Sequence, residues 1–188
     1  MNKNDIILIA AAKNSDKKAL EKLVKKVQPN IYATLTYLKV DHADIHDISQ
    51  EIMLKVANKI HQLKKVEYFK IWLNKIMLNS YYDYLRKNKR DLKEFSFMKN
   101  NYNEILNIAD NTENPQNALL NSELNFIIKA SINNLPLQYK IPIALREFQG
   151  LSYDEISAIT KTSIGTVKSR ISRARTKIKD AIKKYSQT

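Results

Sequence analysis

The sequence predicts an all-α protein with two small helical domains joined by a flexible linker, the C-terminal domain containing a helix-turn-helix. Apolar residues recur at three- and four-residue spacing in both halves of the chain, and the alternating pattern of β-strands is absent. Between the halves, an Asn-rich stretch has few apolar residues and an acidic balance. We therefore place the first domain at residues 1–91, an acidic Asn-rich linker at 92–120 and the second domain at 121–188.

The charge of the chain favours a polyanionic partner. The 188 residues include 32 Lys and Arg against 19 Asp and Glu, which gives a net charge of +13. Residues 1–90 carry 18 basic and 9 acidic side chains, residues 91–134 carry 3 and 6, and residues 135–188 carry 11 and 4. Both domains are therefore basic, which suits a nucleic acid or an anionic membrane surface.

The composition also excludes several kinds of site. The chain has no Cys, so it has no disulfide, thiolate metal site or cysteine nucleophile. Its two glycines, Gly150 and Gly165, are too far apart to form a phosphate-binding loop, and we expect no cofactor. The longest apolar run, residues 6–12, is far shorter than the roughly 20 residues that span a bilayer, so we expect no membrane insertion.

The elements of the first domain follow from apolar spacing. Residues 20–27 and 31–38 have helical periodicity, and Pro29 stands where a new helix could begin. A long amphipathic helix is expected over residues 44–63, because its apolar residues keep to one face while acidic residues share another. A further helix is expected from about residue 68 to 89, and among its aromatic residues Trp72 is the one expected to be buried in the core.

The helices of the second domain are bounded by capping residues. Gly150 follows a helical stretch as a C-terminal cap, Ser152 and Glu155 form a capping box, and Ser163 caps a longer helix after a tight turn. Two helices that meet at such a turn are typical of a DNA-reading helix-turn-helix. The residues expected to face inward are Ile156, Ile159, Ile164, Val167 and Ile171. Those expected to face outward are Thr166, Lys168, Ser169, Arg170, Ser172 and Arg173.

The second domain resembles a known protein family. The strings LPLQYKIPIALREFQGLSYDEISAIT and GTVKSRISRARTKI, with NPQNALLNSEL upstream, resemble the minus-35-reading domain of bacterial RNA polymerase sigma factors of the extracytoplasmic-function (ECF) group, especially the sigma-E type. Two positions depart from that type, since Lys168 replaces an expected Arg and Ser172 an expected aromatic residue. The resemblance implies a minus-35 reading face made of Lys168, Ser169, Ser172 and Arg173. We add Thr166, because a small residue near the helix start allows close approach to the groove.

The string DIHDISQEIMLK in the first domain resembles the polymerase-binding helix of the same family. In that family a polar stripe docks on the clamp helices of the beta-prime subunit, and charge on such a stripe steers docking. The residues that the resemblance assigns to core polymerase are Asp44, Asp47, Gln50, Glu51 and Lys55.

The string KKVEYFKIWLNKIMLNSYYDYLRKNKR interleaves aromatic and basic residues, a combination that binds unstacked single-stranded bases. In the resembling family this region captures a flipped base of the minus-10 element, and Leu63 replaces an expected Phe there. The residues assigned to minus-10 DNA are Leu63, Lys64, Tyr68, Trp72, Ile76, Asn79, Asp83 and Arg86.

The resemblance implies a cytoplasmic transcription initiation factor with no catalysis of its own and no small-molecule substrate. Its expected partners are core RNA polymerase, through the beta-prime clamp helices and the beta flap, promoter DNA and an anti-sigma factor. The acidic linker either mimics RNA in the polymerase or is a plain tether.

Three other functions stay open on the residues alone. An ordinary helix-turn-helix regulator would use only the second domain, and a basic adaptor would bind nucleic acid or membrane without sequence preference. A metalloenzyme would use His42 and His46, which have i, i+4 spacing but lack the glutamate of the HExxH motif.

Overall fold

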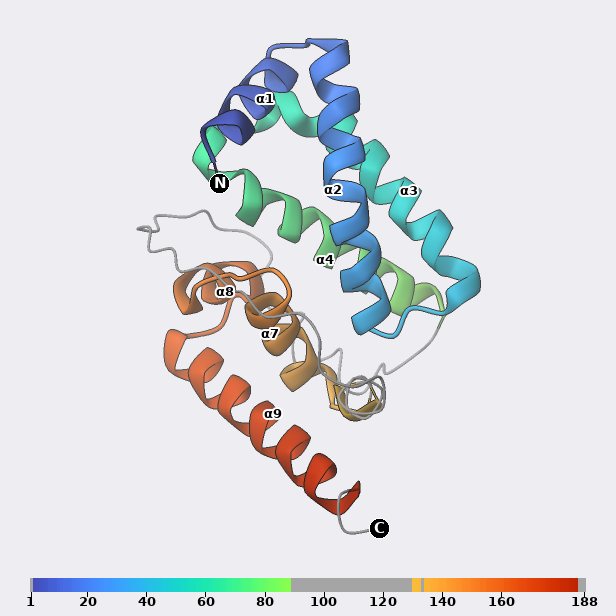
Figure 1. The fold of residues 1–188 in the computed structure, drawn as a ribbon, viewed down its shortest axis with the longest axis vertical. Helices are drawn as coiled ribbons and strands as arrows, with labels where there is room; N and C mark the ends of the chain where they lie inside the picture. The colour runs from blue at the N-terminus through green and yellow to red at the C-terminus, as the bar shows by residue number, and fades with distance from the viewer. Residues whose placement is uncertain (1, 89–129, 133, 186–188) are drawn as a thin grey trace. The chain divides into compact units, whose positions relative to one another are not determined.

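The computed structural model describes residues 2–88, 130–132 and 134–185 (Figure 1). Within these ranges the regular structure is entirely helical, so the all-α prediction is confirmed. The chain divides into two compact units, one containing helices α1 to α4 and the other helices α7 to α9. The expected linker at 92–120 lies outside the described residues.

The N-terminal unit contains four α-helices and two short 3-10 helices. They are α1 (Lys3–Lys13), α2 (Lys17–Tyr37), α3 (His42–Lys59), η1 (Ile60–Gln62), η2 (Val66–Tyr68) and α4 (Phe69–Lys87). Helix α1 begins with a capping box, in which the Asn2 side chain accepts from the Asp5 amide at 2.8 Å and the Asp5 carboxylate accepts from the Asn2 amide at 3.1 Å. Lys26 on α2 pairs with the same carboxylate and joins the two helices.

Helix α2 runs without interruption through Pro29, so the predicted helix start at this proline is wrong. A proline inside a helix costs about 3 kcal/mol, because a backbone hydrogen bond is lost. The apolar residues on either side continue one buried stripe, in which Ile31 and Leu35 are both 0% exposed. Burial of each such side chain contributes about 1.5–3 kcal/mol, which offsets the cost of the proline.

Helices α3 and α4 pack against each other and support two of the three predicted sites (Figure 1). The helix expected over residues 44–63 is shorter as an α-helix, since α3 ends at Lys59 and tightens into η1. The interior face of α3 is apolar apart from Ser49, and Ile52 and Val56 are both 0% exposed. Near the start of α3, the Asp41 amide donates to Tyr84 Oη of α4 at 3.2 Å.

The aromatic residues of α4 are buried in a different order from the one expected. Trp72 is only half-buried, whereas Phe69, Tyr81, Tyr82 and Tyr84 are each at most 6% exposed. The prediction that Trp72 is the ring buried in the core is therefore wrong. The indole lies at the edge of the helix face, tilted against Phe69 with ring centroids 5.9 Å apart.

The C-terminal unit contains α7 (Leu137–Glu147), α8 (Tyr153–Thr160) and α9 (Ile164–Tyr185), which pack on one another. Its core is mostly apolar, and the side chains exposed by 1% or less include Ile141, Leu151, Ile156, Val167 and Ile171. A second cluster joins Leu135, Ile143 and Ala174, with Tyr139 and Ile178 against it. Because α9 contributes to both clusters, its register is fixed against the other two helices.

The caps that set the angle between these helices are those predicted. Gly150 has a φ of 58°, which turns the chain after α7. Ser152 Oγ accepts from the Glu155 amide at 3.1 Å, and Glu155 accepts from the Ser152 amide at 2.6 Å. Ser163 Oγ accepts from the Thr166 amide at 3.1 Å at the start of α9. The predicted helix-turn-helix is therefore confirmed in its local geometry.

Candidate DNA and polymerase interfaces

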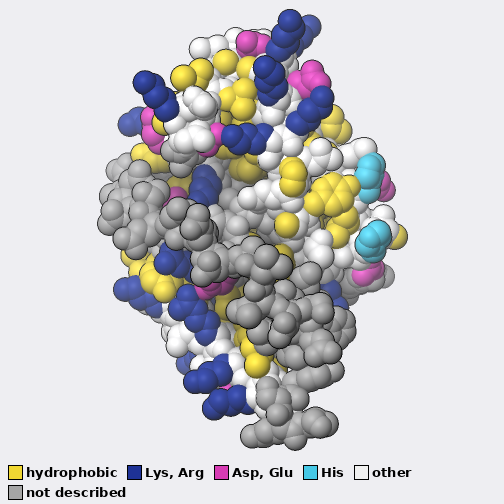
Figure 2. Space-filling model, viewed as in Figure 1, with side chains coloured by type: hydrophobic (Ala, Val, Ile, Leu, Met, Phe, Trp, Pro, Cys, Tyr) yellow, Lys and Arg dark blue, Asp and Glu magenta, His cyan; other side chains and the backbone are white. Residues whose placement is uncertain are grey.

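The outward face of α9 carries most of the residues expected to read the minus-35 element. Lys168, Ser169, Ser172 and Arg173 are exposed, and Thr166 is half-buried. The two hydroxyls nearest the helix start are already engaged, because Thr166 Oγ1 lies 2.8 Å from Ser163 Oγ and Ser169 Oγ donates to the Thr166 carbonyl at 3.0 Å. Lys and Arg side chains gather along α9 in the space-filling view (Figure 2).

Two other expectations on α9 are wrong. Arg170 was expected outward but is 6% exposed, because it lies between Val167 and Ala174 on the packed side of the helix. Ile164 was expected inward but is 39% exposed. It is the first residue of α9. The outward face of α9 is therefore less cationic, and more apolar at its start, than the sequence predicts.

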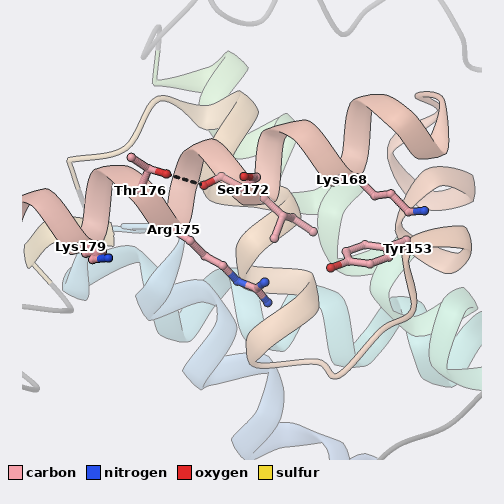
Figure 3. A pocket seen from close by; sticks show the side chains of 7 residues that line it. Tyr153, Lys168, Ser172, Arg175, Thr176 and Lys179 are labelled. Carbon is pink, nitrogen blue, oxygen red and sulfur yellow. Dashed lines mark hydrogen bonds between the residues drawn. The ribbon is translucent and has the colours of Figure 1, made fainter.

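A polar pocket of about 250 Å³ lies beside this reading face (Figure 3). Lys168 Nζ lies 5.9 Å from the centroid of the Tyr153 ring, and Arg146 lies over the same ring at 4.9 Å. Arg175 donates to Glu147 at 2.7 Å, and this hydrogen bond raises the pKa of the Arg175 guanidinium. The residues lining the pocket are Tyr153, Lys168, Ile171, Ser172, Arg175, Thr176 and Lys179. Sequence reasoning had not connected Tyr153 of α8 with this face.

The polar stripe of α3 is accessible along much of its length. Asp47 and Gln50 are exposed, and Asp44 and Glu51 are half-buried. Leu54 lies on the same face and is 63% exposed, which sequence reasoning missed. The signal was present in the spacing, because position 54 is three and four residues beyond Glu51 and Gln50.

Lys55, the last residue assigned to polymerase, differs from the rest of the stripe. Its ammonium lies 2.5 Å from the Glu51 carboxylate and donates to Ser80 Oγ on α4 at 2.9 Å. Asp83 Oδ2 is 3.9 Å away, and the same carboxylate group pairs with Arg86. The structure therefore places Lys55 between the two helices.

The residues assigned to minus-10 DNA fall mostly on one stripe of α4 and its entry. Tyr68, Trp72, Ile76, Asn79 and Asp83 are half-buried and Arg86 is exposed, at successive spacings of three or four residues. Two assigned residues lie before this stripe. Lys64 is exposed and its carbonyl accepts from Lys13 Nζ at 3.2 Å, and Leu63 is 2% exposed in the core.

The histidine pair offers no metal centre within the described parts of the chain. His42 and His46 are both exposed, and His46 Nδ1 lies 3.7 Å from Asp47. Over residues 2–88, 130–132 and 134–185 the side chains form no group of three His, Asp or Glu able to hold a metal ion. Across the same residues, no helix combines the length and apolar character needed to cross a membrane.

Two family models match the two units. Residues 23–91 match the Sigma-70 region 2 family, and residues 126–178 match the Sigma-70 region 4 family. The first range contains α3, α4 and most of α2, and the second contains the helix-turn-helix. The two helical units thus define a sigma factor.

Comparison with whole proteins identifies the group of sigma factors to which this chain belongs. The chain is 35% identical over 181 residues to the ECF RNA polymerase sigma-E factor of Haemophilus influenzae, covering 95% of each sequence. It is 32% identical over 180 residues to the sigma-E factor of Escherichia coli K12, covering 95% of this chain and 94% of that one. This chain therefore belongs to the ECF family of RNA polymerase sigma factors, as the sequence resemblance predicts.

Solved structures have the same fold. The sigma factor RpoE of Bartonella quintana, determined with the anti-sigma factor NepR, matches with a TM-score of 0.66 and 25% identity over 88% of this chain and 98% of that one. CnrH, determined with the cytosolic domain of CnrY, matches with a TM-score of 0.67 and 20% identity over 95% of this chain and 97% of that one. As an ECF sigma factor, the chain acts with core RNA polymerase to initiate transcription at promoter DNA.

Proposed function

We propose that three surfaces divide the work of initiation: the outward face of α9 reads the minus-35 element, the α4 stripe captures the opened minus-10 strand, and the α3 stripe binds core polymerase. The first domain, residues 1–91, would bind polymerase and minus-10 DNA, and the second domain, residues 121–188, would read minus-35 DNA. Residues 92–120 would link the two domains. The observation that carries the polymerase and minus-10 parts of this proposal is the packing of α3 on α4, which presents the two stripes from one pair of packed helices.

The case for α9 rests on which side chains remain available. Lys168 and Arg173 are exposed cations and Ser169 and Ser172 are small, so the helix can approach base edges closely. Packing of Val167, at 0% exposure, against the rest of the unit fixes the direction in which that face points. With Ser172 in place of an aromatic residue, the pocket beside it stays open, so we propose a minus-35 sequence different from that read by the sigma-E type.

The case for the α4 stripe rests on partial burial of its aromatic residues. Tyr68 and Trp72 are held by the fold yet keep accessible ring surface, and Arg86 provides a cation at the far end. Stacking of an unpaired base on such a ring contributes about 1–3 kcal/mol. Between the aromatic residues and Arg86, Ile76 supplies an apolar wall and Asn79 supplies an amide. Leu63 is buried in the core, and direct contact with a base would require its side chain to become accessible.

The case for the α3 stripe rests on charge and exposure together. Asp44, Asp47, Gln50 and Glu51 form an acidic stripe on an otherwise basic chain, which would orient docking on the clamp helices of the beta-prime subunit. The exposed Leu54 adds an apolar contact of the kind that anchors protein interfaces. We also propose that the chain contacts the beta flap of core polymerase.

We also propose an anti-sigma factor as regulator, and the cytoplasm as the site of action. The Bartonella quintana RpoE, whose fold this chain resembles, was solved with such a partner. An inhibitor that covers the α3 stripe would compete directly with core polymerase.

The α3 assignment can be tested by binding to core polymerase. Asp47→Ala combined with Gln50→Ala should lower the affinity for core polymerase by at least about 10-fold, because both side chains are exposed on the stripe. Lys59→Ala, at the exposed end of the same helix, is the matched control and should have little effect. Equal affinities for the double variant and the control would contradict the assignment.

A further inference from the structure

A polar cross-link joins α3, the proposed polymerase-binding helix, to α4, the helix proposed to bind minus-10 DNA. Four charges alternate in sign across it, in the order Glu51, Lys55, Asp83 and Arg86. Ser80, which is 2% exposed, accepts a hydrogen bond from the Lys55 ammonium within this cluster. The cross-link therefore runs from the exposed stripe of α3 to the charged end of the α4 stripe.

The position of the Lys55 ammonium argues against direct contact with polymerase. Its side chain is only 31% exposed, and the nitrogen hydrogen-bonds to Ser80 of α4 and pairs with Glu51 of its own helix. A further carboxylate, that of Asp83, lies within 3.9 Å. Lys59, one turn further along α3, is exposed and makes a natural contrast.

The Asp83 carboxylate is shared between two cations. One oxygen faces Lys55 and the other pairs with Arg86. If the Lys55 charge is removed, Arg86 becomes the remaining cation of the cluster beside this carboxylate. The guanidinium would then be held more tightly by Asp83 and would be less available to a DNA phosphate.

We propose that Lys55 is a positioning residue for minus-10 strand capture rather than a contact with core polymerase. It holds α4 against α3 through Ser80 and shares the Asp83 carboxylate with Arg86, which weakens the hold of Asp83 on the Arg86 guanidinium when Arg86 binds the strand. This inference rests on the proposed function of the α3 and α4 stripes. It predicts that loss of Lys55 separates two activities that direct contact with polymerase would lose together.

The test compares Lys55→Met with Lys59→Met in two assays. The first measures affinity for core polymerase, and the second measures binding of a single-stranded non-template minus-10 oligonucleotide to the assembled holoenzyme. Lys55→Met should bind core polymerase within about threefold of the parent chain but capture the strand about 10-fold more weakly, the loss expected for one charge-assisted contact. Lys59→Met should match the parent in both assays.

Two further experiments distinguish a positioning role of Lys55 from a merely structural one: rescue by a conservative variant, and the coupling between Lys55 and Asp83. Lys55→Arg keeps the charge and should recover strand capture. Because Lys55 is inferred to act through Asp83, adding Lys55→Met to Asp83→Asn should weaken capture less than it does in the parent chain. Should Lys55→Met fail to fold by circular dichroism, Ser80→Ala removes one acceptor of the same cross-link and takes its place in both assays.

The outcomes separate this inference from the proposal on which it rests. Loss of core affinity by Lys55→Met as large as that caused by the Asp47 and Gln50 substitutions would overturn the positioning role. Unchanged strand capture by Lys55→Met, in an assay where Trp72→Ala weakens capture, would also overturn it. If Trp72→Ala itself leaves capture unchanged, the assignment of the α4 stripe is wrong and the inference fails with it.

Discussion

Substitution of Lys168 by Ala tests whether α9 reads base edges. Lys168 is exposed near the start of α9, and its nitrogen lies 5.9 Å from the Tyr153 ring. In the described parts of the chain its ammonium has no salt-bridge partner. Removing the side chain therefore deletes the proposed contact with DNA without leaving a buried charge unpaired, and the change in affinity measures that contact.

The expected magnitude depends on what Lys168 touches. A side chain that reads a base edge contributes about 1–3 kcal/mol of discrimination, equivalent to roughly 5- to 150-fold in affinity. A single amine is a poorer reader of guanine than a guanidinium, so we expect the lower half of this range. A contact with phosphate alone would weaken all sequences equally and lower the salt slope by about 1.

The assay is holoenzyme binding to duplex promoter fragments with an intact or a scrambled minus-35 element, at several salt concentrations. Lys168→Ala should weaken binding to the intact element by about 5- to 10-fold and leave binding to the scrambled element nearly unchanged. Lys177→Ala is the control, because nine residues further along the helix is the opposite face. Equal losses on both fragments would refute base reading by Lys168.

Three further predictions concern stability. Ser152→Ala removes the cap of the eight-residue α8 and should destabilise the chain by about 1 kcal/mol in urea unfolding, while an unchanged midpoint would show that the capping box contributes nothing. Ile156→Ala, at a side chain that is 0% exposed, should cost about 2–5 kcal/mol by the same measurement, and a loss below about 1 kcal/mol would mean that the core is less well packed than described. The hydrogen bond from Lys26 holds the pKa of the Asp5 carboxyl below its ordinary value, so its stabilisation is complete above about pH 4 and is lost as the pH falls through the folded-state pKa. Asp5→Asn should therefore flatten the acid side of the stability profile, and an identical profile would contradict the ion pair.

Local signals in the sequence predicted the C-terminal unit well. Gly150, Ser152 and Glu155 each have a strong conformational or hydrogen-bonding preference at a helix end, so their roles depend on few distant contacts. The same holds for the apolar spacing that predicts α3 and α4. These features are determined within a few residues, which is why the fold class and the helix-turn-helix followed from the sequence.

The expectations that proved wrong all depend on tertiary packing. Pro29 has the local preference of a helix start, but burial of the residues beyond it keeps α2 continuous. Arg170 is charged and was expected outward, but its whole side chain is buried between apolar neighbours, including Nη1 of the guanidinium. Trp72 is large and apolar, yet its position at the edge of α4 leaves part of the ring accessible.

The candidate sites likewise combine features that local sequence predicts with features that depend on tertiary packing. Helical spacing placed Asp44, Asp47, Glu51 and Lys55 on one face of α3, while the α4 residues came from the interleaving of aromatic and basic residues and from the family resemblance. The spacing did not reveal that Lys55 reaches across to Ser80, because a contact between residues 25 positions apart depends on how the two helices cross. The exposure of Leu54 and the pocket next to Tyr153 likewise follow from packing between helices.

The central claim is that one chain both binds core RNA polymerase and selects a promoter. The most direct measurement adds the purified chain to core polymerase and maps the 5′ ends of transcripts made from fragments of its own genome. We predict that the chain co-elutes with core polymerase and that transcripts start at discrete sites, with transcription lost when Asp47 and Gln50 are replaced together. Binding to DNA without any binding to core polymerase would contradict the account and leave the helix-turn-helix as an ordinary regulator.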